Sequence, residues 1–207
     1  MAEGIDFGSL ALWLDLIGTF VFGLSGGVLA VRRNLDLFGV IVLASAAATA
    51  GGAIRDMAIG AQPAAVLQDE WYLLMALAAG IVAFVAHRTI EKLNKPVMLL
   101  DAVGLGVFAV SGAQKALLFD LGPAAACLIG VLTAVGGGVV RDLLVADVPR
   151  VLREEIYAVA AIVGSILVVA GNHFDWPPLL TAGVAFVATF SIRLLSVRYG
   201  LRMPKAR

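Results

Sequence analysis

Charged residues are scarce in this sequence of 207 residues. They make up 14% of it, whereas hydrophobic residues make up 61% and the mean hydropathy is +0.98. A soluble domain carries roughly 25% charged residues, and so few charges cannot cover a core built from the remaining apolar side chains. The composition therefore excludes a soluble enzyme and indicates a membrane protein that crosses the bilayer several times.

Further absences narrow the class of protein. Lys plus Arg and Asp plus Glu number 15 each, so the positive surplus typical of nucleic-acid binding is missing and we expect no nucleic-acid partner. The single cysteine, Cys127, cannot form an intrachain disulfide or a metal site by itself, and its apolar neighbours predict a small buried hydrophobe. The sequence also lacks a phosphate loop, a nucleophile elbow and an HExxH motif. We therefore expect neither an enzyme nor a cofactor.

Seven apolar segments approach the length of about 20 residues that a helix needs to cross a bilayer. The N-terminus is acidic and lacks the basic region of a cleavable signal peptide, so the first segment is expected to remain in the protein. We predict an all-α membrane protein with a single transmembrane domain over residues 1–207. The predicted spans are 9–31, 36–59, 69–87, 97–118, 122–145, 154–171 and 177–196.

The basic residues predict the orientation of these spans. The connections 60–68, 119–121 and 172–176 contain no Lys or Arg. Cytoplasmic connections carry an excess of basic residues, so the N-terminus is predicted outside and the tail, residues 197–207, in the cytoplasm. The basic residues lie after the first, third, fifth and seventh segments, at Arg32, Arg33, Arg88, Lys92, Lys95, Arg150, Arg153, Arg198, Arg202, Lys205 and Arg207.

The sequence repeats itself at an offset of 86 residues. Matched polar residues, glycines and prolines at one offset are hard to obtain by chance, so we interpret them as an internal duplication. One copy covers about 9–90, the second about 96–172, and the last span, 177–196, has no counterpart. Each copy has three spans, an odd number, so the second copy enters the membrane from the opposite side. The two copies are therefore inverted relative to each other, as in transporters and channels. The offset pairs Asp15 with Asp101, Gly18 with Gly104, Phe22 with Phe108, Ser25 with Ser111, Gly26 with Gly112, Gly51-Gly52 with Gly137-Gly138, Arg55-Asp56 with Arg141-Asp142, Pro63 with Pro149, and Trp71 with Tyr157.

Glycine clusters mark the second and fifth spans. Gly51 and Gly52 precede one Arg-Asp pair, and Gly136, Gly137 and Gly138 precede the other. Consecutive glycines weaken a helix and favour a bend that frees carbonyls toward a cavity, where they could coordinate a cation near Gly51 and Gly137. Close helix packing through small residues is the alternative. Because the clusters recur beside charges, we favour a pair of kinked, pore-lining helices, and no firm metal site is predicted.

Intramembrane charges are costly and mark ion or substrate paths by default. Arg55-Asp56 is predicted toward the outside and Arg141-Asp142 toward the cytoplasm. Adjacent helical residues do not face one another, so these are not expected to be simple neighbouring ion pairs. A structural pairing remains the alternative to a role in a pore or gate. The candidate pore or gate residues are Lys115, Ser111, Gln114, Asp101, Asp15, Ser25, Arg55, Asp56, Arg141 and Asp142.

The fourth span carries an unusual lysine. Asp101, Phe108 and Lys115 are seven residues apart and share a helix face. Asp101 and Lys115 are separated by about 21 Å along the axis, at a rise of 1.5 Å per residue, so they cannot pair. The repeat counterpart of Lys115 is Leu29, so this charge is not a remnant of the duplication. It either snorkels to the outer interface or lies in a permeation path, where it tunes the passage of cations.

This pattern resembles the trimeric intracellular cation (TRIC) channel family, and more closely its bacterial members. The likeness rests on two three-helix repeats, each with a Ser-Gly step and a Gly-Gly-x-x-Arg-Asp motif, plus a lone seventh helix. It implies a homotrimer in membrane lipid, in the bacterial inner membrane, with a K⁺ or Na⁺ pore in each protomer. Carried over by position, the glycines would be the kinks and Lys115 the pore lysine. Vertebrate members share a Lys-Glu-Val triplet, and here it reads Lys115-Ala116-Leu117.

Three functions fit these features. A passive K⁺-permeable channel accounts for the intramembrane charges. An alternating-access carrier of a small solute such as glycine fits the inverted repeats equally well, and related bacterial sequences carry a glycine-transporter label. Such a carrier needs a compact site for a carboxylate and an amine. The sequence shows no evident site of this kind, and Arg55 or Arg141 with an Asp is the available candidate. An assembly protein without transport leaves the duplicated charges unexplained.

Overall fold

The computed structural model describes residues 7–90, 92, 95–153 and 156–200. Seven of its helices are long and apolar enough to cross a membrane, and their ends match the predicted spans to within three residues. The predicted tail lies outside the described residues from 201 onward, as does the N-terminal stretch 1–6. The helices are α1 (Phe7–Arg32), α2 (Leu37–Ile59), α3 (Ala65–Gln68), α4 (Glu70–Ile90), α5 (Pro96–Leu118), α6 (Pro123–Leu144), α7 (Arg150–Arg153), α8 (Ile156–His173) and α9 (Pro178–Tyr199).

Local sequence signals set the helix ends. Asp36 caps α2 by accepting a hydrogen bond from the Gly39 backbone N–H at 2.8 Å, which satisfies one of the free donors of a helix start. Gly60 ends α2 at a φ of 75°, a conformation that glycine adopts without strain. Proline opens α5, α6 and α9, where its missing N–H costs nothing. The breaks seen in the sequence are therefore real helix boundaries.

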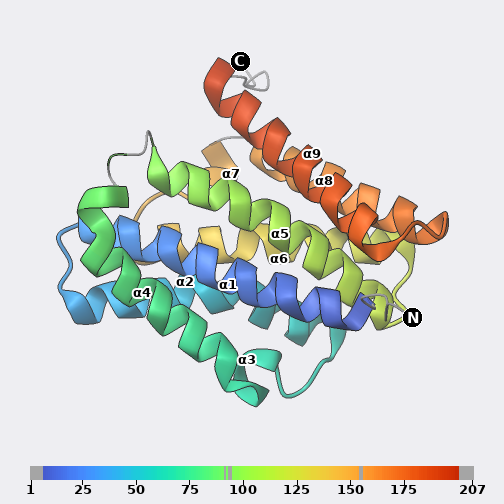
Figure 1. Cartoon of the computed structure of the whole chain (residues 1–207), viewed down its shortest axis with the longest axis horizontal. Helices are drawn as coiled ribbons and strands as arrows, with labels where there is room; N and C mark the ends of the chain where they lie inside the picture. Colours follow the sequence, from blue (N-terminus) through green and yellow to red (C-terminus); the bar gives the residue numbers. More distant parts are fainter. Residues whose placement is uncertain (1–6, 91, 93–94, 154–155, 201–207) are drawn as a thin grey trace, which may run out of the picture.

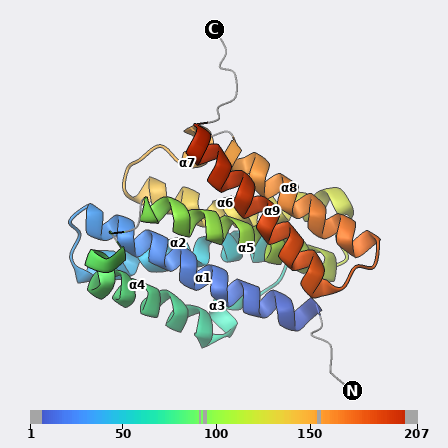
Figure 2. The same ribbon diagram turned by 45° about the horizontal axis from the view of Figure 1, so that its top comes forward.

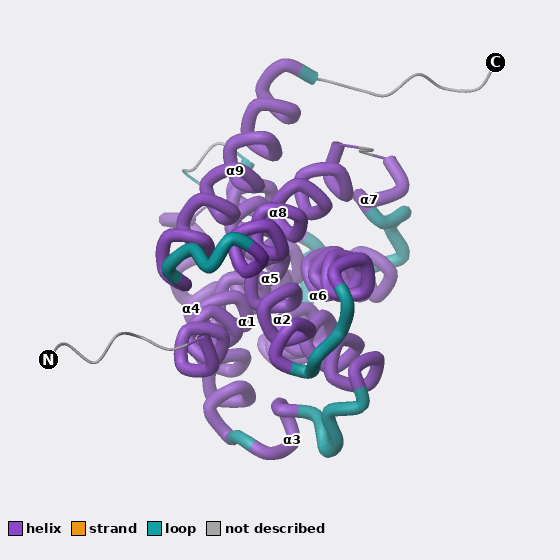
Figure 3. Tube along the Cα trace, turned by 90° about the vertical axis from the view of Figure 1, so that its right-hand side faces the viewer, coloured by secondary structure: helices purple, strands orange, loops and turns teal. Residues whose placement is uncertain are grey.

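Helices α1 and α5 form the centre of the bundle and run antiparallel (Figure 1). Behind them α2 packs against α6. Viewed nearly end-on, α9 lies at one margin and α3 with α4 at the other (Figure 3). The turned view in Figure 2 likewise shows α4 and α9 on opposite sides of α1 and α5. The fold is thus all-α, with two inverted three-helix repeats and a seventh helix.

The glycine clusters bring α2 and α6 into close contact. A Cβ added to Gly51 would lie 2.3 Å from the Thr133 carbonyl oxygen, and one added to Gly137 would lie 2.4 Å from the Ala47 carbonyl oxygen. Both helices are continuous through these glycines. The expected release of carbonyls is therefore wrong, because the helical hydrogen bonding is not interrupted and the facing backbone fills the space. A bend without a break stays a prediction.

The remaining clustered glycines have different surroundings. A Cβ on Gly136 would lie 3.0 Å from the Gly51 Cα, so this glycine belongs to the same helix contact. At Gly138 the nearest atom would be the Tyr157 hydroxyl at 2.9 Å, and at Gly52 the Arg55 guanidinium at 3.7 Å. Two of the five glycines thus leave room for functional side chains rather than for another helix backbone.

Candidate functional site

The first polar cluster joins α1, α2 and α5. The Arg55 guanidinium donates to Asp15 at 2.6 Å and to Asp56 at 2.8 Å, and the Lys115 ammonium contacts Asp56 at 2.8 Å. Arg55, Asp15 and Asp56 are at most 4% exposed, whereas the Lys115 side chain is 20% exposed. Two cations face two carboxylates, so the cluster balances its own charge inside an apolar bundle.

Two further contacts fix the carboxylates of this cluster. The second oxygen of Asp56 accepts from the backbone N–H of Ala65, at the start of α3 and 2.9 Å away. Tyr72 on α4 donates its hydroxyl to Asp15 at 3.2 Å. Each carboxylate therefore has a polar partner on another element besides Arg55, which holds the site in a defined geometry.

The second cluster repeats the first at the same offset. Arg141 donates to Asp101 at 2.7 Å and to its neighbour Asp142 at 2.9 Å, and the second oxygen of Asp142 accepts from the Arg150 backbone N–H at 3.0 Å. Arg141 also donates to Ser25 on α1 at 2.6 Å. Asp15 and Ser25 thus mark two clusters about 15 Å apart along α1, at 1.5 Å of rise per residue.

These contacts correct two expectations. Arg55 and Asp56 do form an ion pair although they are adjacent, as do Arg141 and Asp142, because the long arginine side chain folds back over its neighbour while bonding the other helix. The predicted pairing of Trp71 with Tyr157 is shifted by one residue. Tyr72 contacts Asp15 and is buried, whereas Trp71 is exposed.

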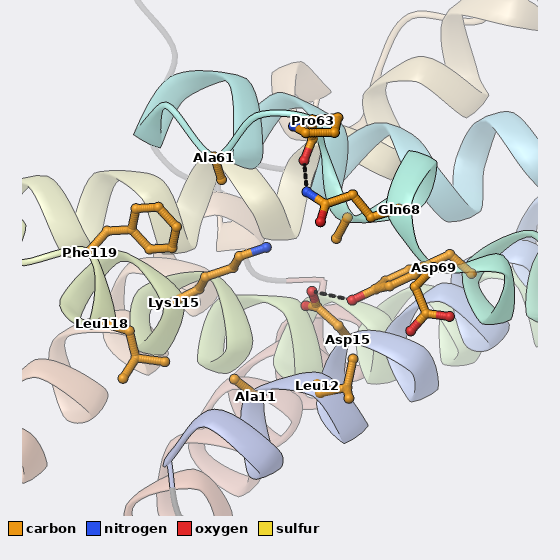
Figure 4. A pocket seen from close by; sticks show the side chains of 12 residues that line it. Ala11, Leu12, Asp15, Ala61, Pro63, Gln68, Asp69, Lys115, Leu118 and Phe119 are labelled. Carbon is orange, nitrogen blue, oxygen red and sulfur yellow. Dashed lines mark hydrogen bonds between the residues drawn. The ribbon is translucent and has the colours of Figure 1, made fainter.

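A cavity of about 350 Å³ opens above the first cluster. The Lys115 ammonium points into it, beside Gln68 and Asp15 (Figure 4). Besides Lys115, the acidic residues Asp15 and Asp69 line it, while Leu12, Leu118 and Phe119 make part of its wall apolar. A water-accessible space thus reaches an intramembrane lysine. This arrangement favours a lysine in a permeation path, because a lysine that only snorkels to the lipid interface needs no such cavity.

A separate, much smaller space, of about 10 Å³, shares Asp15, Ala65 and Tyr72 with the lining of the cavity. Gly52, Arg55 and Phe108 also line it. This volume is close to that of a single water position. The small space is therefore bounded by both the first cluster and Phe108.

Two predicted residues belong to neither the cavity nor the two clusters. Ser111 and Gln114 on α5 are fully buried and do not line it. Their polar side-chain atoms have no hydrogen-bond partner among the described residues.

No group of three or more His, Cys, Asp or Glu that could hold a metal ion occurs within residues 7–90, 92, 95–153 and 156–200. Cys127, expected to be buried, is partly exposed.

Arg193 on α9 is a buried charge that the repeat pattern does not single out. It is 1% exposed, and its guanidinium carbon lies 4.8 Å from the centre of the Tyr157 ring. Tyr157 in turn lies beside Asp101 over Gly138. The seventh helix therefore brings a cation next to the second cluster. Its position inside the apolar span 177–196 was the available signal.

Comparisons with known proteins agree with this architecture. The family model described as glycine transporter matches residues 12–88 and 98–173. The UPF0126 inner membrane protein YadS of Escherichia coli is 41% identical over 197 residues, which cover 94% of this chain and 95% of that protein. The glycine-transporter description is a label of the family.

Solved structures match over nearly the whole chain. The TRIC trimeric intracellular cation channel orthologue from Rhodobacter sphaeroides is 35% identical, with a TM-score of 0.89, and the match covers 93% of this chain and 100% of that one. A prokaryotic TRIC channel in 0.5 M KCl is 33% identical, with a TM-score of 0.83 over 93% and 98% of the two chains. The chain therefore belongs to the TRIC channel family, together with the UPF0126 membrane proteins.

Proposed function

We propose that this protein is a passive, K⁺-permeable cation channel with a pore inside each protomer of a homotrimer. The observation that carries the proposal is the contact between Lys115, which lines the cavity, and the buried Asp56. A charged pair between two helices beside a water-accessible space has the position and chemistry of a gate.

The surrounding charges favour cations over anions. Asp15 and Asp69 line the cavity, and carboxylates concentrate cations near a pore entrance. Lys115 opposes this attraction while its ammonium occupies the cavity. When it moves away from Asp56, that carboxylate becomes available to a passing cation. A K⁺ ion then replaces part of its water shell with carboxylate oxygens.

The proposed path continues between the two repeats. It follows α2, α5 and α6, passes the centre of the bundle and reaches the second cluster around Arg141. The inverted repeats support one path with related charged clusters toward its two ends. With the N-terminus outside, the cavity faces the periplasm and the second cluster faces the cytoplasm. Homotrimer formation is supported by the trimeric solved relative.

A carrier of a small zwitterion is the second candidate. One observation favours it: the cavity brings Lys115 together with Asp15 and Asp69, so one wall could take a carboxylate and another an amine. The sequence alone showed no such compact site at Lys115. This reading requires saturable uptake of the solute, which a passive channel does not.

Liposome assays separate the two functions. Purified protein is reconstituted into KCl-loaded liposomes, and K⁺ efflux is followed in the absence and presence of glycine, with labelled glycine uptake measured in parallel. The channel predicts K⁺ efflux that needs no solute. Saturable glycine uptake without independent K⁺ efflux would contradict the channel and support the carrier.

A further inference from the structure

The turn that joins α1 to α2 and the turn that joins α5 to α6 lie at opposite ends of the bundle and have the same backbone hydrogen bond. The Leu35 N–H donates to the Ala30 carbonyl at 3.1 Å, and the Leu121 N–H donates to the Ala116 carbonyl at 3.1 Å. These two hydrogen bonds are 86 residues apart. Asn34 and Asp120, also 86 apart, both have a φ of 56°. The turn from α1 to α2 and the turn from α5 to α6 are therefore the same structure.

The turns that follow α2 and α6 also match. The Ala61 N–H donates to the Asp56 carbonyl at 2.8 Å, and the Asp147 N–H donates to the Asp142 carbonyl at 2.9 Å. The residue before each donor lies in the left-handed region, with a φ of 75° and 57°. Because these turns are alike, their side chains distinguish the end that carries Ala61 and Phe119, here called the first mouth, from the end that carries Asp147 and Arg33, the second mouth.

The side chains at these matched positions differ completely. Ala61 and Phe119 line the open cavity at the first mouth. Their counterparts at the second mouth, Asp147 and Arg33, are joined by a salt bridge between the two turns. Deeper in the bundle, Lys115 lines the cavity, whereas its counterpart Leu29 is only 9% exposed. The second mouth thus has a salt bridge, here called the tie, at the positions that line an open cavity at the first mouth.

We propose that Arg33 and Asp147 are two further residues of the ion path, and that their salt bridge holds the second mouth closed. This inference rests on the proposed channel function. Release of the pair frees Asp147 as a carboxylate that attracts cations at this mouth, as Asp15 and Asp69 do at the other. The predicted orientation places the tie at the cytoplasmic side.

The exposure of the pair sets the size of its effect. The Arg33 and Asp147 side chains are 44% and 43% exposed, and pairs this exposed are weak and screened by salt. Their loss is therefore expected to raise the open-to-closed ratio by about fivefold at most. A weak tie suits a mouth that must open repeatedly, and it makes opening sensitive to ionic strength.

Bilayer recordings of Arg33→Ala and Asp147→Asn test the tie, with Arg88→Ala as a matched control. Arg88 is an exposed cation at the same end of the bundle. Each variant of the pair is expected to raise open probability two- to fivefold, and the increase is expected to be smaller at high salt. The charge swap, Arg33→Asp with Asp147→Arg, is expected to restore the wild-type open probability. Unchanged open probability, or an equal effect of Arg88→Ala, overturns the inference. If the wild-type protein carries no current, the result contradicts the proposed channel function rather than the role of the salt bridge.

Thiol labelling gives a readout that does not depend on current. Leu29→Cys is introduced into a Cys127→Ala background and labelled in vesicles with a membrane-impermeant reagent. Adding Arg33→Ala is expected to speed labelling several-fold, and only from the side that carries the Arg33 turn. Equal rates with and without Arg33→Ala would contradict a closed second mouth even in a protein that conducts.

Discussion

Phe22 and Phe108 stack at the centre of the bundle, with ring centroids 5.3 Å apart and planes 19° apart. Each ring also lies over a glycine of the opposite repeat: a Cβ on Gly104 would meet the Phe22 ring at 2.7 Å, and one on Gly18 the Phe108 ring at 2.4 Å. The two rings are 86 residues apart and each follows a cluster aspartate by seven residues. The pair therefore occupies the meeting point of the two repeats.

This ring pair is predicted to be the narrowest point of the path. Phe108→Leu keeps an apolar side chain but removes the stacked ring, at a cost of about 0.5–1.5 kcal/mol. We expect faster K⁺ flux from liposomes with a modest loss of thermal stability. Phe190→Leu is the control, since Phe190 stacks with Phe186 on α9 at 5.9 Å. If both variants leave flux unchanged, the constriction lies elsewhere.

Removal of the Lys115 charge is expected to change single-channel conductance or open probability. Lys115→Ala frees Asp56 of one partner, whereas Lys115→Arg keeps the charge and the contact. The account predicts altered currents for the alanine variant, near-normal currents for the arginine variant, and trimers in both by size-exclusion chromatography. Wild-type currents in Lys115→Ala would remove this residue from the pore.

The buried Arg141 contacts predict a large loss of stability when one partner is removed. Arg141→Met leaves Asp101 charged in a site where both side chains are fully buried, which typically costs about 3–5 kcal/mol. Adding Asp101→Leu removes the stranded charge and is expected to recover part of this loss. Thermal unfolding in detergent measures both. A single variant as stable as wild type would show that the cluster does not stabilise the fold.

The glycines at the α2–α6 contact are expected to tolerate no side chain. Gly51→Ala and Gly137→Ala place a methyl group less than 2.5 Å from a carbonyl oxygen, and overpacking of this kind typically costs about 1–3 kcal/mol. Gly183→Ala is the matched control, because nothing lies within 4 Å of its added Cβ. We expect lower melting temperatures for the first two variants only. Equal melting temperatures in all three would contradict close backbone contact.

The sequence was sufficient to predict the helices, their inversion and the charged residues of both clusters. Hydropathy fixes span length, and the offset that pairs Asp15 with Asp101 depends on residues that are rare in an apolar chain. The contacts between these residues needed three-dimensional information. Helix geometry argues against a bond between Arg55 and Asp56, but it does not describe how far a guanidinium can fold back.

Other features escaped sequence reasoning for different reasons. The glycine clusters fit both released carbonyls and a close helix contact, and only the facing carbonyls at Thr133 and Ala47 reveal the contact. Arg193 has no counterpart in the repeat, so a search based on the offset passes over it. The cavity at Lys115 depends on α3, which is too short to leave a hydropathy signal.

Planar-bilayer recording of the purified protein distinguishes a cation channel from the alternatives. With a KCl gradient across the membrane, the account predicts unitary currents that reverse near the K⁺ equilibrium potential and need no added solute. Reversal near the Cl⁻ potential would contradict cation permeation. A silent bilayer, with the same preparation taking up a small solute in a saturable manner, would contradict the channel itself.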